Sequence, residues 1–425
     1  MAGCEIVSLK AREILDSKAR PMVEVDVWTA DGAMGRGASP CGTSVGAHEA
    51  FVLRDGGTRY GGLGVRQAVG HVTETISPAI RGMDVLDQRA IDLRMVALDG
   101  TPNKSRLGAN AIYSVSIAVA RAAAAARGIP LHRHLGGETA CTLPVPMFNM
   151  LNGGHGGAKI EFQEFLFVPA GAPTYSEALR IGVEVFAALG AVIERRYGRD
   201  ALHAGGSAGY SAPASDPGEN LDLLLAAAQR AGYAGQCRVG LDCAASHFYD
   251  SDARGYRLQG RTVPREELVR RLEDLARAYS LFVVEDPLEE NDFEGHAEVT
   301  RRLGTTTIIG DDLFVTNLGR LQRGIALGAA NAMLLKPNMV GTITEALDAA
   351  RYATAHGYRV VGSGRAGGSI DDPIPDIAVA VGAPLVKFGA PRTGERLGKQ
   401  NCLLRMEEEF GEMGRFAGQD LFRTS

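Results

Sequence analysis

The sequence predicts an α/β protein with a small N-terminal α+β domain over residues 1–140 and a (β/α) barrel over residues 141–425. Three observations predict this class. Strand-like and helix-like segments alternate through the second part, and its strands are continuous apolar runs, typical of a parallel sheet covered on both faces. The first part instead begins with a hairpin pattern followed by helical segments. A chain of 425 residues can form two or three domains with a large core.

The N-terminal domain is predicted from a hairpin, a loop and a long helix. Apolar and polar residues alternate on both sides of Asp31-Gly32, a dipeptide typical of hairpin turns. The following stretch, SPCGTSVGAHEA, is too rich in turn-forming residues to be a strand. A helix is expected from Arg106 to Arg127, because Gly128 and Pro130 follow at positions typical of a helix end.

The barrel is predicted to begin after LPVPMFNMLNGGHGG, the segment that starts at Leu143. EFLFVPA is an expected strand, and TYSE, from Thr174 to Glu177, is a capping box that opens a helix running to about Gly198. Later helices are expected to begin near Asn220, Pro264, Asp292, Asn317 and Thr342, and the last two strands to be YRVVG and PLVKF.

Four apolar runs each end in a charged residue: VGLD at Asp242, FVVED at Glu285, TIIGDD at Asp311 and AMLLK at Lys336. These positions lie 43, 26 and 25 residues apart, which leaves room for a helix between successive strands. In a (β/α) barrel the carboxyl ends of the strands converge on one face, where the active sites of that fold lie. We therefore expect three carboxylates and a lysine to share one site.

Three converging carboxylates suit a hard cation such as Mg²⁺, which binds oxygen ligands and usually also substrate oxygens. A cation beside Lys336 would lower the pKa of that lysine and allow it to act as a general base. The alternative is that all four residues are ordinary charges at strand ends, facing solvent or helix N-termini.

Composition argues against several classes of protein. The net charge is −5 and the lysines and arginines are scattered, so no nucleic-acid surface is expected. No apolar run reaches 18 residues and the N-terminus has no signal-peptide pattern, so we expect a soluble cytoplasmic protein that does not bind membranes. The six cysteines form no C-x-x-C pair, which argues against zinc and disulfides.

One motif offers a different interpretation. GSGRAG, from Gly362 to Gly367, matches the G-x-G-x-x-G pattern of dinucleotide-binding folds. Such a fold would place an acidic residue at the end of the next strand, but that strand ends at Lys387. A barrel loop near the metal is the preferred interpretation.

Ten segments spread over nearly the whole chain match one known family. They are DSKARPMVEV, GAHEAFVLRDG, KSRLGANAIYSVSIAVARAAA, LPVPMFNMLNGG, QEFLFVPAGA, GLDCAAS, VVEDPLEEND, GDDLFVTN, LLKPNMVGTITEA and GERLGKQNCLLRMEEE. In these segments the chain resembles the enolases. The resemblance implies an enolase-like α/β fold, with an N-terminal α+β capping domain and a modified (β/α)8 TIM barrel whose first turns depart from regular βα order. It also implies a homo-oligomer, most often a homodimer.

The resemblance further implies a site with two Mg²⁺ ions. Asp242, Glu285 and Asp311 match the ligands of the first ion, and Ser44, in the mobile Gly-rich loop, matches a ligand of the second. Lys336 matches the base that removes the proton from carbon 2 of a phosphoglycerate. Lys387, Glu164, Arg365, Gln163 and His155 match further residues: the lysine that stabilises the enolate, a catalytic carboxylate, the phosphate-binding arginine and two substrate contacts.

The chain also departs from the enolase pattern. Gly206 and Ser207 stand where enolases have an acidic pair, whose glutamate helps to protonate the departing hydroxide. Gly364 and Ala366 replace a histidine and a serine. We expect these small residues to enlarge the site, with Ser207 and Gly364 contacting the substrate.

Hydroxide is a poor leaving group, and loss of its general acid should slow the reaction by roughly a hundred- to ten-thousandfold. The sequence thus predicts an Mg-dependent lyase or transferase of the enolase superfamily that forms an enolate but expels phosphate. This pattern fits the carboxyphosphonoenolpyruvate synthases of phosphonate antibiotic biosynthesis, which join a cytidylyl-activated phosphonoformate to a phosphoglycerate.

Two other functions remain open. The first is a glycolytic enolase whose acid is relocated, for example to Glu164. The second is a non-catalytic enolase-like binding protein, against which the retention of Lys336, Lys387 and all three carboxylates argues. Exchange of the carbon-2 proton with solvent would distinguish an enzyme from a binding protein.

Overall fold

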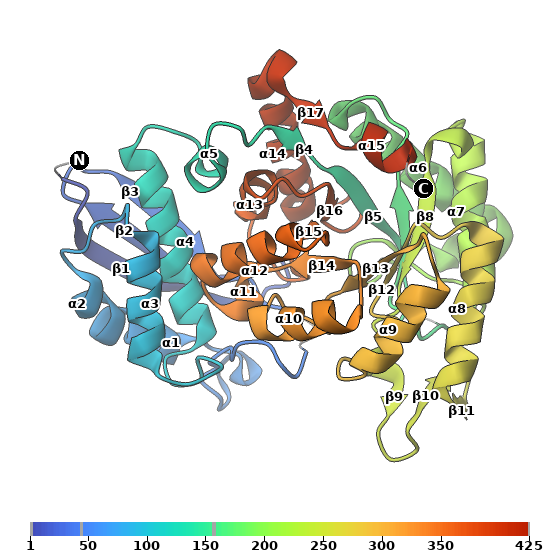
Figure 1. Ribbon diagram of the computed structural model, residues 1–425, viewed down its shortest axis with the longest axis horizontal. Helices are drawn as coiled ribbons and strands as arrows, with labels where there is room; N and C mark the ends of the chain where they lie inside the picture. The colour runs from blue at the N-terminus through green and yellow to red at the C-terminus, as the bar shows by residue number, and fades with distance from the viewer. Residues whose placement is uncertain (1–2, 43–45, 155–158, 424–425) are drawn as a thin grey trace.

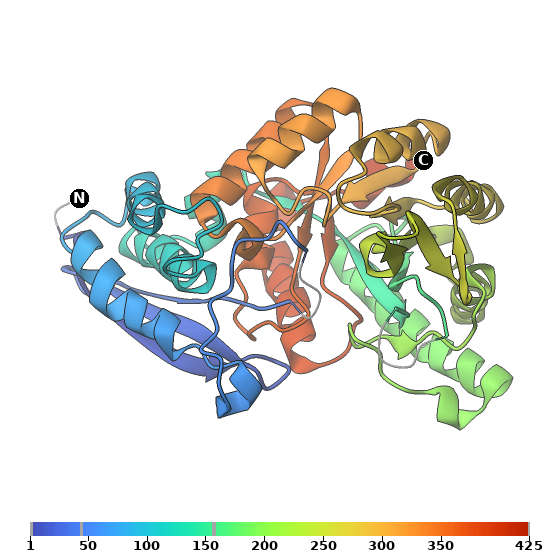
Figure 2. The ribbon, with the colours of Figure 1, turned by 90° about the horizontal axis from the view of Figure 1, so that it is seen from below.

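The computed structural model describes residues 3–42, 46–154 and 159–423. Its N-terminal part begins with an antiparallel sheet of β1 (Ile6–Leu15), β2 (Pro21–Thr29) and β3 (Met34–Ala38), in the order β1-β2-β3. The predicted hairpin is confirmed, since Trp28 pairs with Met34 across the Asp31-Gly32 turn. This part lies at one side of the barrel in both views (Figures 1 and 2).

Helices pack on this sheet: α1 (Arg66–His71), α2 (Ser77–Ile80), α3 (Gln88–Asp99), α4 (Ala109–Ala126) and α5 (Leu131–Gly136). α4 lies directly against β3, because a Cβ atom at Gly35 would come 2.0 Å from the Ala118 carbonyl oxygen. By length and composition α4 is the one helix in the described ranges that could span a membrane, but 83% of its apolar stretch is buried inside the protein. It is the core helix of this part.

Eight strands form the closed barrel: β5 (Val145–Asn152), β6 (Glu164–Val168), β8 (Arg238–Asp242), β12 (Val283–Glu285), β13 (Thr307–Gly310), β14 (Ala332–Leu335), β15 (Arg359–Ser363) and β16 (Leu385–Lys387). Pairing of β16 with β5 closes it. β6 is antiparallel to both of its neighbours, whereas the other barrel pairs are parallel. This confirms the modified (β/α)8 fold, with the irregularity in the first turns.

The main barrel helices are α6 (Tyr175–Tyr197), α7 (Pro217–Ala231), α8 (Arg265–Tyr279), α9 (Phe293–Arg302), α10 (Leu318–Leu327), α12 (Ile343–Ala355), α13 (Ile374–Ala380) and α14 (Gly394–Phe410). The predicted cap is present, since the Glu177 amide donates to Thr174 Oγ1 at 3.2 Å. α7 begins three residues before the expected Asn220, because Asp216 caps it and Pro217 occupies its first position.

Shorter elements complete the described chain. The strands are β4 (Thr142–Leu143), β7 (Tyr210–Ser211), β9 (Tyr249–Asp250), β10 (Gly255–Leu258), β11 (Arg261–Val263) and β17 (Arg415–Phe416), and the helices are α11 (Pro337–Val340) and α15 (Gly418–Arg423). Single turns are η1 (Arg59–Gly62), η2 (Val72–Ile76, a π-turn), η3 (Arg199–Ala201), η4 (Ala234–Gln236), η5 (Ala245–Phe248) and η6 (Gly411–Met413).

The segment that follows β3 reaches from the N-terminal part to the carboxyl ends of the barrel strands. Cys41 and Gly367 exchange two backbone hydrogen bonds, of 2.9 and 3.1 Å. Asn338 Nδ2, in α11, donates to the Pro40 carbonyl oxygen at 3.3 Å. The N-terminal part therefore contributes directly to the face on which β12 to β16 end.

Candidate active site

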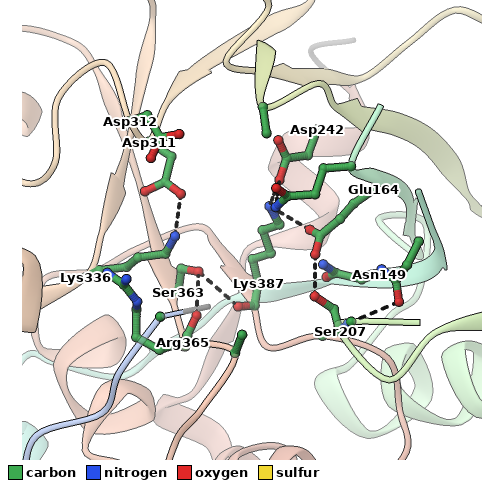
Figure 3. Close-up of a pocket in the computed structure, with 18 of the residues that line it drawn as sticks. Asn149, Glu164, Ser207, Asp242, Asp311, Asp312, Lys336, Ser363, Arg365 and Lys387 are labelled. Carbon is green, nitrogen blue, oxygen red and sulfur yellow. Dashed lines mark hydrogen bonds and ion pairs between the residues drawn. The ribbon is translucent and has the colours of Figure 1, made fainter. Parts of the chain in front are cut away.

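The four charged residues predicted at strand ends lie together at the carboxyl face of the barrel. Asp242 pairs in register with Glu285 at the ends of β8 and β12, while Asp311 and Lys336 directly follow β13 and β14. Asp242, Asp311 and Lys336 line a cavity of about 270 Å³ that Lys387 also lines (Figure 3). A cavity of this size suits a small polar metabolite.

Lys387 lies at the centre of this site, with carboxylates around its ammonium group (Figure 3). Its Nζ is 2.7 Å from Asp242 Oδ2, 2.8 Å from Glu285 Oε2 and 2.9 Å from Glu164 Oε2. Burial alone would lower the pKa of Lys387, but these carboxylates outweigh burial and hold its pKa well above the ordinary value. Lys387 is therefore a fixed positive charge.

Lys336 forms an ion pair with Asp311 at the opposite side of the cavity. Burial lowers the pKa of Lys336, but the negative charges around it, chiefly Asp311 and then Glu285, together outweigh burial, so the net shift is upward. A lowered pKa for this lysine, as the sequence leads us to expect, thus requires a positive charge beyond those of the protein. A bound divalent cation would supply one.

The carboxylates fit a divalent cation. Asp242 Oδ1, Glu285 Oε1 and Asp311 Oδ1 are buried and, within residues 3–42, 46–154 and 159–423, have no hydrogen-bond partner. In each carboxylate, one oxygen therefore contacts a lysine and the other can still bind a cation. Burial, and then the neighbouring negative charges, raise the pKa of Glu285 well above its ordinary value. A cation would relieve this repulsion, and hard oxygen ligands are those that Mg²⁺ prefers.

Asp286 is an acidic residue of the site that the sequence analysis did not single out. Oxygen atoms of Glu285, Asp286 and Asp311 lie within 4.8 Å of one another. Both oxygens of Asp286, however, accept backbone hydrogen bonds, at 3.0 Å from the Asp311 amide and 2.7 Å from the Asp312 amide. Asp286 therefore supports the loop after β13. The sequence signal that could have identified Asp286 was the presence of two consecutive acidic residues at positions 285–286 and again at 311–312.

Four residues at which the chain departs from the enolase pattern lie in the same cavity. Gly206, Ser207, Gly364 and Ala366 all line it. The Ser207 hydroxyl donates to Glu164 Oε1, and the Ser207 amide donates to Asn152 Oδ1 at 3.2 Å. Burial raises the pKa of Glu164, but Lys387 and the Ser207 hydrogen bond outweigh burial and lower it. Glu164 is thus a hydrogen-bond acceptor here.

Gln163 also lines the cavity, and its Nε2 is 3.5 Å from Asp242 Oδ2. Lys18 reaches the cavity from the loop between β1 and β2, and its Nζ donates to the Gly206 carbonyl oxygen at 3.1 Å. Sequence reasoning missed Lys18 because it comes from the N-terminal part, and only folding brings it to the barrel.

Arg365 is engaged by the N-terminal part. Its Nη1 and Nη2 donate to Glu49 Oε2 and Oε1 at 2.8 and 3.1 Å, and both side chains are buried. Burial would lower the pKa of Arg365, but Glu49 raises it. The pair ties the segment after β3 to the loop after β15. Ser44 and His155 lie outside the described residues.

Comparison with known proteins gives matches to a single family over nearly the whole chain. The model of the family described as "Enolase, C-terminal TIM barrel domain" matches residues 140–425, and that described as "Enolase, N-terminal domain" matches residues 6–135. The chain belongs to the enolase family. Similar proteins named "Enolase" come from Methanopyrus kandleri (50% identical, covering 98% of this chain and 99% of that protein), Acidothermus cellulolyticus (49%; 98% and 97%) and Thermococcus kodakarensis (47%; 98% and 97%).

Family membership confirms an Mg²⁺-dependent enzyme of the enolase superfamily and the lyase class. It also corrects one prediction. The predicted function, a carboxyphosphonoenolpyruvate synthase that uses a cytidylyl-activated phosphonoformate, is wrong, because full-length relatives at 45–50% identity are named enolases. The predicted transferase class and the predicted role in phosphonate antibiotic biosynthesis are wrong for the same reason. The prediction rested on the missing acid, but a missing side chain does not specify another leaving group. Other protic groups line the same cavity.

Proposed function

We propose that the protein is a glycolytic enolase, an Mg²⁺-dependent enzyme that dehydrates 2-phosphoglycerate to phosphoenolpyruvate. The observation that carries this proposal is the arrangement of two lysines and three carboxylates. Within the described part of the chain, Asp242, Glu285 and Asp311 each have one buried oxygen without a hydrogen bond. We expect the enzyme to act as a cytoplasmic homodimer, like the family that it belongs to.

Lys336 is the proposed base. Its Nζ lines the cavity and is held by Asp311, so it can take the proton from carbon 2 of the substrate once its own pKa is lowered. Removing this proton beside a carboxylate creates a second negative charge. Lys387, with its pKa held high, is the fixed charge that stabilises the resulting enolate.

Asp242, Glu285 and Asp311 are the proposed ligands of one Mg²⁺, and Ser44 of a second. Bound Mg²⁺ would supply Lewis-acid charge at the substrate carboxylate. Arg365 is proposed to bind the phosphate, which requires the phosphate to share or replace the contact with Glu49. Gln163, Glu164, Ser207, Gly364 and His155 are proposed to surround the rest of the substrate.

The test is formation of phosphoenolpyruvate from 2-phosphoglycerate and Mg²⁺, followed by absorbance at 240 nm. Wild-type protein should turn over and should exchange the carbon-2 proton in deuterated water. Lys336→Ala should lose both reactions by at least roughly a hundredfold, because both begin with the same proton transfer.

Lys10→Met is the matched control. It removes an exposed lysine from β1 that does not line the cavity, and it should leave both rates unchanged. A wild-type protein that catalyses neither reaction would refute the proposed function, and full activity in Lys336→Ala would refute the assignment of the base.

A further inference from the structure

The departing hydroxide of the proposed reaction needs a proton, and the usual glutamate is absent from the cavity wall. Ser207, which stands in its region, already donates its hydroxyl hydrogen to Glu164. Glu164 in turn accepts from Lys387, and its lowered pKa keeps it ionised. Neither of these two groups holds a proton that it can readily give.

Lys18 is a cation that lines the same cavity. It lines the cavity together with Ser207, Gly364 and Lys336, and its Nζ donates to the carbonyl oxygen of Gly206, the residue before Ser207. An ammonium group has three hydrogens, of which this contact uses one. No carboxylate of the described ranges lies within ion-pair distance of Lys18 Nζ, in contrast to Lys336 and Lys387.

Space and solvent access favour this lysine as well. A Cβ atom built on Gly206 would meet nothing within 4 Å, and Gly206 is itself exposed, so the Lys18 contact is open to solvent. Lys18 lines this cavity and is exposed to solvent, although neighbouring groups cover part of its side chain. A proton lost from its Nζ can therefore be replaced from water in each turnover.

We propose that Lys18 is the catalytic proton donor to the leaving hydroxyl group, an inference that rests on the proposed function. Lys336 takes the carbon-2 proton, and the electron pair of that C–H bond becomes the new C2=C3 bond. The C3–O bond breaks with its electrons on oxygen, and that oxygen takes a hydrogen from Lys18 Nζ to leave as water. Lys18, now a neutral amine, is recharged by solvent.

The surroundings of Lys18 suit this role. Burial, followed by the positive charges of Arg396 and Arg20, lowers the pKa of Lys18, while Asp16 and Glu395 oppose the shift with smaller effects. A lysine with a lowered pKa is a stronger acid, and it gives up a proton more readily at neutral pH.

The test separates elimination from proton exchange in Lys18→Met, Lys18→Arg and the control Lys10→Met. Lys18→Met should form phosphoenolpyruvate roughly a hundred- to ten-thousandfold more slowly, while exchange of the carbon-2 proton continues at nearly the wild-type rate. Wild-type elimination should decline as pH rises through the pKa of Lys18, since the donor must be protonated. Lys18→Arg keeps the positive charge but does not release its proton, so its elimination should stay slow, as in Lys18→Met.

Two outcomes would overturn the assignment of Lys18. One is wild-type elimination in Lys18→Met. The other is an equal loss of elimination and exchange, which would indicate that Lys18 only holds the Gly206 loop in place. If wild-type protein catalyses neither reaction, the proposed function fails and this assignment fails with it, whereas wild-type turnover with an unaffected Lys18→Met refutes Lys18 alone.

Discussion

In each carboxylate of the proposed metal site, one oxygen contacts a lysine and the other is left for a further partner. One oxygen of Asp242 and one of Glu285 contact Lys387, and one oxygen of Asp311 contacts Lys336. Among the residues that the structure describes, the other three oxygens are buried without hydrogen bonds. Burial raises the pKa of Asp242 to about 6, with Lys387 opposing this and Glu164 adding to it. Without a cation, these charges repel one another.

Replacing one of these carboxylates should therefore weaken Mg²⁺ binding without destabilising the metal-free protein. Mg²⁺ should raise the melting temperature of the wild type by mass action, and Glu285→Gln should bind Mg²⁺ at least roughly tenfold more weakly. In EDTA, Glu285→Gln should melt at or above the wild-type temperature, because repulsion is reduced. Thermal scans over a series of Mg²⁺ concentrations measure both effects.

Glu294→Gln is the control, since Glu294 is 68% exposed in the first turn of α9 and does not line the cavity. It should behave as wild type at every Mg²⁺ concentration. Wild-type Mg²⁺ affinity in Glu285→Gln would contradict the assignment of this carboxylate as a ligand.

Residue patterns in the sequence predicted the strand-end residues of this site but not its long-range contacts. The apolar runs that end at Asp242, Glu285, Asp311 and Lys336 were enough to place these four side chains together, because parallel barrel strands all end on one face. The contacts of Lys18 with Gly206, and of Glu49 with Arg365, join positions 188 and 316 residues apart, and no local pattern signals them.

At the scale of elements, helix α9 contains a titratable group that the site does not use. His296 is fully buried, and its Nδ1 is 2.9 Å from the Asp292 carbonyl oxygen. Burial lowers the pKa of His296 from 6.5 to about 4, against a smaller opposing effect of Asp292. The folded helix therefore holds the neutral imidazole over most of the pH range.

This burial should make stability depend on pH. Between about pH 6.5 and pH 4 the unfolded chain binds a proton at His296 that the folded chain does not, so the free energy of unfolding falls as pH falls. The contribution of His296 should be about 2 kcal/mol smaller at pH 5 than at pH 7. His296→Asn, which keeps a donor near the Asp292 carbonyl, should lose this part of the dependence in urea unfolding.

His356→Asn is the matched control. His356 makes the same type of contact, with Nδ1 2.8 Å from the carbonyl oxygen four residues earlier, but it is exposed at the end of α12. Its variant should keep the wild-type pH dependence. An unchanged pH slope in His296→Asn would contradict the role given to burial.

At the scale of the whole molecule, a buried ion pair connects the N-terminal part to the barrel. Glu49 holds Arg365 through two hydrogen bonds, and it also accepts the Gly46 amide at 3.0 Å. The same arginine is the proposed phosphate ligand. The Glu49 carboxylate and an anionic substrate therefore compete for one guanidinium group.

Glu49→Gln should destabilise the protein, because it removes the negative charge beside a buried arginine. We expect the free energy of unfolding to fall by about 3 kcal/mol. Inorganic phosphate should restore more stability to this variant than to the wild type, since an anion can take the place of the carboxylate at Arg365. Chemical unfolding with and without phosphate measures both differences.

Glu138→Gln provides the comparison, because Glu138 is 76% exposed and lies 3.8 Å from Arg133. Its effect should stay within about 0.5 kcal/mol. A Glu49→Gln variant as stable as the wild type, or one that phosphate stabilises no more than the wild type, would contradict the proposed competition at Arg365.

The sequence by itself determined the barrel class, most helix starts and the carboxylates and lysines at the strand ends, because hydrophobic periodicity, caps and strand-end charges act over a few residues. Only the tertiary structure decided how these charges pair, that Asp286 supports a loop, and that Lys18 and Glu49 reach the cavity from the N-terminal part. The missing acid suggested a different leaving group because sequence shows only which side chain is lost. Which groups surround that position depends on long-range packing, which brings distant loops to the same cavity.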